Sequence, residues 1–139
     1  MSIFCPCGSA LEYNICCEPY ITGKKIASEP GILMRSRYSA YVKRNVDYLI
    51  ISWHPDCCPE NFRDTLIQKE RKWHGLTVIE ESVGSHINEG FVEFSACFTD
   101  KNTTKKIIIH ERSRFLRVNK IWYYIDGIFK YPISSNNDI

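Results

Sequence analysis

The sequence lacks the features that commonly mark membrane-spanning, exported and nucleic-acid-binding proteins. No apolar run approaches the roughly 20 residues that a membrane-spanning helix needs. The stretch from Met1 to Cys5 has no basic region and no apolar segment, so we expect no signal peptide. The net charge is only +2, which gives no reason to expect a nucleic-acid partner or an anionic membrane. We therefore expect a cytoplasmic protein that does not bind membranes.

Repeats and low-complexity segments are also missing, and the remaining composition is that of a globular protein. The chain has 139 residues, enough for one domain with a core of its own. Hydrophobic residues make up 44% and charged residues 24%, which excludes a disordered chain. Cysteine is plentiful, with seven residues. Without an export signal, we interpret these cysteines as metal ligands or buried thiols rather than as disulfides.

The N-terminal cysteines predict a metal site. Four of the seven lie in the first 17 residues, at Cys5, Cys7, Cys16 and Cys17. Cys5 and Cys7 fall on one side of a tight turn that Gly8 permits. The adjacent pair Cys16 and Cys17 would close the other side of the metal site. Four thiolates suit one tetrahedral Zn²⁺ ion with a structural role, and so short a segment suits one ion better than an iron–sulfur cluster. The alternatives are a strained disulfide between adjacent cysteines, or four unrelated buried thiols.

The rest of the chain predicts an α+β fold. We expect three helices, which begin near Pro30, Asn45 and Pro59, and the third continues to about Lys72 with Trp73 on its apolar face. Beyond Gly75 the hydrophobic period changes to two, which predicts strands at residues 76–83, 91–99, 105–118 and 121–125. Short turns between these strands indicate an antiparallel sheet, and one of its faces must be buried by the helices.

These patterns divide the chain into three parts. We expect a zinc-binding knuckle at residues 1–24, an α+β domain at 28–131 and a flexible tail at 132–139. The boundary falls in a short linker with Pro19, Gly23, Lys24 and Lys25. On this division, loss of Cys16 or Cys17 unfolds residues 1 to about 20 and leaves the α+β domain folded.

The cysteine spacing resembles the SEC-C motif, the zinc knuckle at the C-terminal end of the SecA translocation ATPase, and every ligand position is matched. The sequence beyond it resembles the YchJ family of small bacterial proteins at residues 16–21, 33–41, 53–55, 110–115 and 122–127. The resemblance implies a SEC-C knuckle joined to a curved, cone-shaped domain similar to nuclear transport factor 2. Ala10 stands where many SEC-C motifs have a second glycine. Some YchJ-type proteins carry a second motif near their C-terminus, whereas here no cysteine follows Cys97.

A second candidate site lies in the strand predicted at residues 105–118. One face carries Glu111 and Ser113, but apolar residues occur on both faces, so the sequence does not decide which face is inside. A buried Glu111 would have a raised pKa and could act as a general acid or base, with His54 as its partner. The alternative is a structural ion pair between Glu111 and Arg35 or Arg37, with His54 bound to backbone carbonyls at a helix end.

Two functions follow from these sites. The first is a non-enzymatic protein-interaction or adaptor module that docks another protein through the zinc knuckle, with Lys24, Lys25 and the backbone around Gly8 at its rim. The second is a small-molecule-binding protein or an enzyme that uses the cavity of the cone. A nucleic-acid partner is not expected, because basic residues at 100–120 face acidic residues at 80–99 on neighbouring strands.

Overall fold

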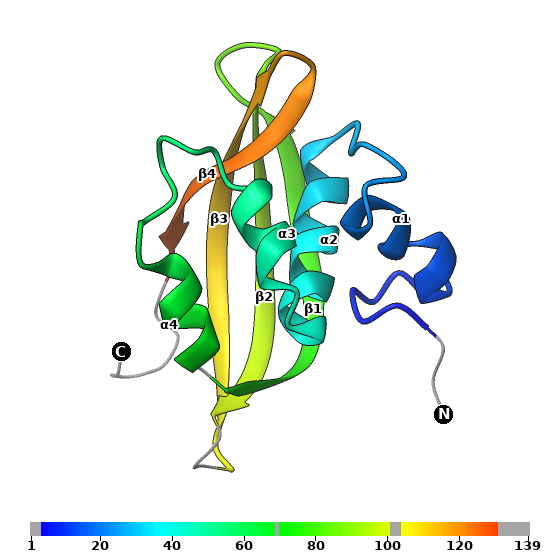
Figure 1. The fold of residues 1–139 in the computed structure, drawn as a ribbon, viewed down its shortest axis with the longest axis vertical. Coiled ribbons are helices and arrows are strands. Elements are labelled where there is room, and N and C mark those ends of the chain that lie inside the picture. The colour runs from blue at the N-terminus through cyan, green and yellow to red at the C-terminus, as the bar shows by residue number, and fades with distance from the viewer. Residues whose placement is uncertain (1–3, 69, 101–103, 131–139) are drawn as a thin grey trace.

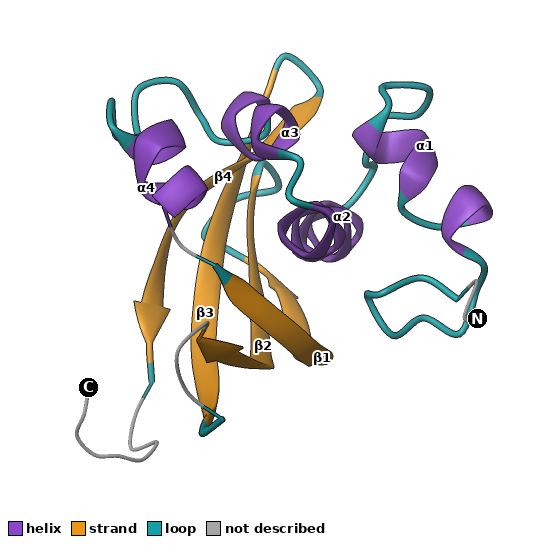
Figure 2. Ribbon diagram, turned by 60° about the horizontal axis from the view of Figure 1, so that its bottom comes forward, coloured by secondary structure: helices purple, strands orange, loops and turns teal. Residues whose placement is uncertain are grey.

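A four-stranded antiparallel sheet, covered on one face by helices, organises the computed structural model, which describes residues 4–68, 70–100 and 104–130. Its strands follow one another across the sheet in chain order, as β1 (Arg71–Val83), β2 (Glu89–Asp100), β3 (Lys106–Val118) and β4 (Ile121–Phe129). Three helices lie on the same face of the curved sheet (Figures 1 and 2), namely α2 (Pro30–Lys43), α3 (Val46–Ile51) and α4 (Phe62–Gln68). The α+β architecture predicted from the sequence is confirmed.

The inner face of the sheet is set by β2. Its apolar residues alternate with polar ones, and the buried ones are Val92, Phe94, Ala96 and Phe98. Phe94 pairs with Glu111 and Val92 pairs with Ser113 across β2 and β3, and directly paired residues point to the same side of an antiparallel sheet. Glu111 and Ser113 therefore face the helices, which settles the orientation that the sequence left open.

The prediction that the third helix continues to about Lys72 was wrong. Helix α4 ends at Gln68, and Trp73 lies in β1, directly opposite Phe98 of β2. The Trp73 ring has its centroid 5.2 Å from that of Phe98 and 5.6 Å from that of Tyr38. Gly75 does not end a helix but lies in β1 beside a shift in strand register. The spacing of Trp73 in the sequence also fits a helix, but its aromatic packing across the sheet places it in a strand.

Charged side chains pair across the outer face of the sheet, as the charge distribution predicted. Arg114 Nε donates to Glu89 Oε2 at 2.9 Å, from β3 to β2. Glu93 of β2 contacts His110 Nε2 at 2.6 Å and Lys130 Nζ at 3.2 Å. The basic third strand is therefore partly neutralised by the acidic second strand.

The N-terminal knuckle packs beside α2, on the side away from α3 and α4 (Figures 1 and 2). It contains an antiparallel bridge between Phe4 and Glu12, a short 3-10 turn η1 (Tyr13–Ile15) and one short helix α1 (Glu18–Ile21). The buried side chains of Cys5, Cys7 and Cys17 belong to the same apolar cluster as residues of α2 and β2. The knuckle and the cone therefore share a core. The predicted flexible tail, 132–139, lies outside the described residues.

Helix α2 begins at Pro30, as predicted, but the carboxylate that caps it comes from the sheet. The side chain of the N-cap residue Glu29 makes no capping hydrogen bond. Instead, the Gly31 N–H donates to Glu81 Oε2 of β1 at 2.9 Å. A side chain at position 31 would meet that carboxylate and force it to shift, so glycine leaves room for this contact.

We expect Glu81→Ala to lower the free energy of unfolding by about 1 kcal/mol, because it removes an anionic hydrogen-bond acceptor from a helix N-terminus. Glu29→Ala is the matched control at the same helix end and should change stability by less than about 0.5 kcal/mol. Urea unfolding of the three proteins measures both effects. Equal stability of the two variants would contradict capping by Glu81.

Candidate functional site

The first two cysteines are positioned by a tight N-terminal turn. The Cys5 N–H donates to the Leu11 carbonyl at 2.7 Å, and the Gly8 N–H donates to the Cys5 carbonyl at 3.2 Å. Gly8 has a φ of +83°, in the left-handed region that glycine adopts without strain. Cys7 lies in this turn with no exposed surface. The turn that the Cys-x-Cys-Gly pattern predicted is therefore present.

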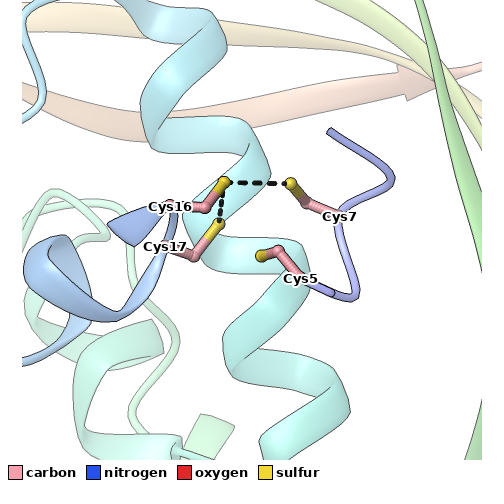
Figure 3. Close-up of side chains that lie close together, drawn as sticks. All are labelled: Cys5, Cys7, Cys16 and Cys17. Atoms are coloured by element: carbon pink, nitrogen blue, oxygen red, sulfur yellow. Dashed lines mark hydrogen bonds between the residues drawn. The ribbon is translucent and has the colours of Figure 1, made fainter. Parts of the chain in front are cut away.

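The four sulfur atoms form one compact cluster (Figure 3), because the adjacent pair faces this turn from the segment between η1 and α1. All four Sγ atoms lie within 4.8 Å of one another. Cys16 Sγ is 3.6 Å from Cys7 Sγ and 3.9 Å from Cys17 Sγ. The edge of a tetrahedron of sulfurs around an ion at 2.3 Å is about 3.8 Å. Both the donor set and these two separations therefore fit a thiolate-bound metal ion.

The thiols share their protons unequally. Hydrogen bonding with Cys17 lowers the pKa of Cys7 to about 4, against the opposing effect of burial. The same hydrogen bond raises the pKa of Cys17, and burial raises that of Cys16 to about 11. Arg35, whose Nη1 lies 3.8 Å from Cys7 Sγ, also lowers the pKa of Cys7. A metal that binds all four sulfurs must displace the remaining protons.

Polar groups of the turn and of α2 surround the sulfur cluster. Ser9 Oγ lies 3.1 Å from Cys16 Sγ, and Ser39 Oγ lies 3.3 Å from Cys5 Sγ. Arg35 Nη1 donates to the Cys7 carbonyl at 2.9 Å and approaches its sulfur at 3.8 Å. These roles were not predicted from the sequence, where Arg35 was a candidate partner of Glu111. The signal available in the sequence was the spacing of Arg35 and Ser39, which places them on one face of a helix.

The other cysteines do not form a second cluster. Cys57 is exposed, Cys58 is partly buried in the loop after α3, and Cys97 lies on β2. Within residues 4–68, 70–100 and 104–130, the four N-terminal cysteines form the only group of three or more histidine, cysteine or acidic side chains arranged to hold a metal.

A cavity of about 320 Å³ lies between the helices and the inner face of the sheet. Its walls are largely aromatic and include Tyr38, Trp53, Trp73, Phe94, Phe115 and Tyr124. Glu111, Arg37 and Arg71 contribute the charged groups. The interior of the cone is therefore not completely filled by side chains.

Glu111 lies in the wall of this cavity and is only 8% exposed. Its Oε2 accepts hydrogen bonds from Ser113 Oγ at 2.8 Å and from Tyr124 Oη at 3.1 Å. Burial raises the pKa of Glu111, and the two hydrogen bonds oppose this effect. A side chain at position 127 would collide with the Glu111 carboxylate. Gly127 therefore provides the space that this carboxylate occupies. No cation lies within ion-pair distance among the described residues, so the predicted pair with Arg35 or Arg37 does not form.

His54 lies apart from Glu111. Its backbone N–H donates to the Tyr124 carbonyl at 3.0 Å, and its Nδ1 accepts from the Asp56 N–H at 3.1 Å. The imidazole packs edge-on against Tyr123, with ring centroids 5.6 Å apart. His54 is not among the residues that line the cavity. The structure does not join these two predicted acid–base candidates in one site.

Comparisons with known proteins agree with this combination of a knuckle and a cone. The family described as "YchJ, middle NTF2-like domain" matches residues 29–127. UPF0225 proteins of Yersinia pestis (strain Pestoides F) and Yersinia pseudotuberculosis (serotype O:3, strain YPIII) are each 58% identical over 140 residues, with 99% of this chain and 90% of each relative covered.

Two solved structures share the fold. The solution structure of a SEC-C motif containing protein from Rhodopseudomonas palustris has a TM-score of 0.75 and 30% identity, and the match covers 89% of this chain and 96% of that one. The crystal structure of a SEC-C motif containing protein from Psychrobacter arcticus has a TM-score of 0.72 and 26% identity, with 94% and 84% covered. The fold and the site thus define a protein with a SEC-C motif and an NTF2-like cone. The chain belongs to the YchJ family.

No helix within the described ranges has both the length and the apolar character needed to cross a membrane.

Ala10 gives a prediction about the knuckle. It has a φ of +69°, a left-handed conformation that is strained for a residue with a Cβ atom. We expect Ala10→Gly to raise the free energy of unfolding by about 0.5–1 kcal/mol, since the relief of strain exceeds the added flexibility of the unfolded chain. The control Ala27→Gly, at a buried site without positive φ, should be destabilising. Chemical denaturation measures both, and a destabilising Ala10→Gly would refute the strain.

Glu111 gives a prediction about pH. Because its pKa is raised on folding, the native state holds this proton more tightly than the unfolded chain does. Its contribution to stability is therefore greatest below the unfolded pKa and is lost as the pH rises through the folded pKa. We expect the wild type to lose stability relative to Glu111→Gln as the pH rises above the ordinary pKa of a glutamate, about 4.3, measured by urea unfolding. Glu60→Gln removes an exposed carboxyl group and is the control for whether the trend is specific to Glu111. A difference for Glu111→Gln that is constant or opposite in sign would show that the pKa is not raised.

Proposed function

We propose that this protein is a zinc-binding adaptor whose knuckle holds one structural Zn²⁺ ion and docks another protein. The observation that carries the zinc assignment is the sulfur cluster itself, with separations of 3.6 and 3.9 Å that match a tetrahedral thiolate site. Cys5, Cys7, Cys16 and Cys17 would supply all four ligands. Such a closed site leaves no position for water or substrate, so the ion would stabilise the knuckle rather than catalyse a reaction.

Exposed apolar side chains of the N-terminal region support the docking role. Leu11, Ile15 and Ile26 are 50%, 61% and 67% exposed. Lys24 and Lys25 are exposed beside Ile26. Apolar groups bordered by positive charge suit a protein partner with an apolar contact and acidic residues around it. The proposal also places the protein in the cytoplasm, where thiols remain reduced.

The zinc assignment predicts one zinc per chain in protein purified under reducing conditions. Cys7→Ser should lose the metal, because Cys7 is fully buried at the centre of the site. Cys57→Ser should retain it, since that thiol is exposed and outside the cluster. Native mass spectrometry of the three proteins measures the stoichiometry. Metal-free wild-type protein, or loss of metal in both variants, would contradict the assignment.

The docking role is tested with the same pair of variants. A photoreactive amino acid at position 15 should crosslink to a discrete partner protein in cells, and the crosslink should disappear with Cys7→Ser but persist with Cys57→Ser. Ile128, which is 68% exposed on β4, is the control position and should give no such product. Equal products from both positions, or a crosslink that survives Cys7→Ser, would refute docking through the knuckle even if zinc is bound.

A further inference from the structure

The cavity of the cone has the size and walls of a small-molecule site. Its volume of about 320 Å³ lies at the lower end of the range for ligand pockets, about 300–1,000 Å³. At about 30 Å³ for each water, it could accept a molecule with on the order of ten non-hydrogen atoms. The aromatic rings of Tyr38, Trp73 and Phe94 line it, so a compact aromatic or similarly apolar body suits these walls.

Arg71 brings to this cavity a cation that is paired at a distance but lacks a hydrogen-bond partner at Nε. Its guanidinium makes no hydrogen bond to any residue within the described ranges, and its Nε is buried without a hydrogen-bond partner. The closest carboxylate oxygen is Asp100 Oδ1, 3.7 Å from Nε, which is beyond hydrogen-bond distance. The guanidinium carbon lies 4.1 Å from the centroid of the Phe98 ring. The terminal nitrogens of Arg71 therefore retain donors for a ligand.

Arg37 adds a second positive charge to the wall. It is only 5% exposed, and among the described residues no carboxylate lies within 4.0 Å of it. Its Nη1 donates to the Leu49 carbonyl at 2.8 Å and to Ser52 Oγ at 2.6 Å, so its position is fixed. Buried charges are ordinarily paired. The cavity wall itself carries two guanidinium groups and one carboxyl group, Glu111, whose burial favours the neutral form. Asp100, 3.7 Å from Arg71 Nε, lies outside that wall and offsets part of the positive charge.

We propose that the cavity binds a small organic acid, one carboxylate attached to a compact aromatic body. The ligand carboxylate accepts hydrogen bonds from the terminal nitrogens of Arg71, and its ring packs against Trp73 and Phe94. The charge excess favours an anion over a cation of the same shape. The largely apolar walls favour a monoanion with a ring over inorganic phosphate, whose charge would be poorly solvated there. This proposal is independent of the metal in the knuckle.

Phenylacetate and phenethylamine test it with the full, metal-loaded chain, because they share a ring but differ in the sign of charge. We expect phenylacetate to shift the indole N–H resonances of Trp53 and Trp73 in a saturable manner, with at least tenfold weaker binding of phenethylamine. Equal or tighter binding of the amine would overturn the proposal. So would the absence of shifts at those two tryptophans with phenylacetate at up to 20 mM, which is about the weakest binding of interest for so small a ligand.

Variants then identify the anchor. Arg71→Gln should weaken phenylacetate binding about tenfold or more, the loss expected for a charge-assisted hydrogen bond. Arg63→Gln removes an equal charge from α4, where Arg63 pairs with Asp47 outside the cavity, and should leave the affinity unchanged. Dispersed amide resonances would establish that each variant is folded. Should Arg71→Gln not fold, Arg71→Lys must still weaken binding, because it loses the planar pair of donors. Unchanged affinity in either folded Arg71 variant would refute the role of Arg71.

Discussion

The attachment of the four-cysteine cluster to helix α2 is the constraint on which the N-terminal knuckle depends. Residues 4–21 contain too few apolar side chains to form a core of their own. They are held instead by the convergence of four sulfurs within 4.8 Å and by contacts with Arg35 and Ser39. A metal at the cluster would connect the turn around Cys7 to the segment around Cys17. The contacts with α2 would then fix the knuckle relative to the cone.

Helix α2 consequently serves both candidate sites. Arg35 and Ser39 face the sulfur cluster, whereas Arg37, Tyr38 and Tyr41 line the cavity. The helix is buried over most of its length, which explains why its sequence is not simply amphipathic. Its N-terminus is tied to β1 through Glu81. Substitutions in α2 can therefore disturb both sites.

Much of this arrangement could be predicted from the sequence, where local chemistry decides the outcome. Asn45 caps α3 as expected, because its Oδ1 accepts from the Tyr48 N–H at 3.0 Å. The cysteine spacing likewise predicted a site that the structure brings together. The position of Trp73 could not be predicted, since its spacing fits a helix and only packing against Phe98 places it in β1. The inward direction of Glu111 was also hidden, because it depends on the register of β3 against β2.

The sheet also shows how a buried acid is accommodated. Glu111 has no ion-pair partner among the described residues, and its Oε2 depends on two hydroxyl donors and on the space above Gly127. Ser113 is visible two residues along the same strand, whereas the Tyr124 donor and the space at Gly127 depend on the pairing of β3 with β4. Glu111 and Arg37 both lie in the wall of one cavity but do not form a close ion pair. The polar groups of the cavity therefore come together only when the helices and strands of the cone assemble.

X-ray absorption at the zinc edge of the purified protein tests the proposed metal centre most directly, because it reports the atoms bound to the ion. The four-cysteine site predicts a coordination shell of four sulfurs at about 2.3 Å, without nitrogen or oxygen ligands. A shell with two or fewer sulfurs, or with oxygen ligands, would contradict a closed site formed by Cys5, Cys7, Cys16 and Cys17.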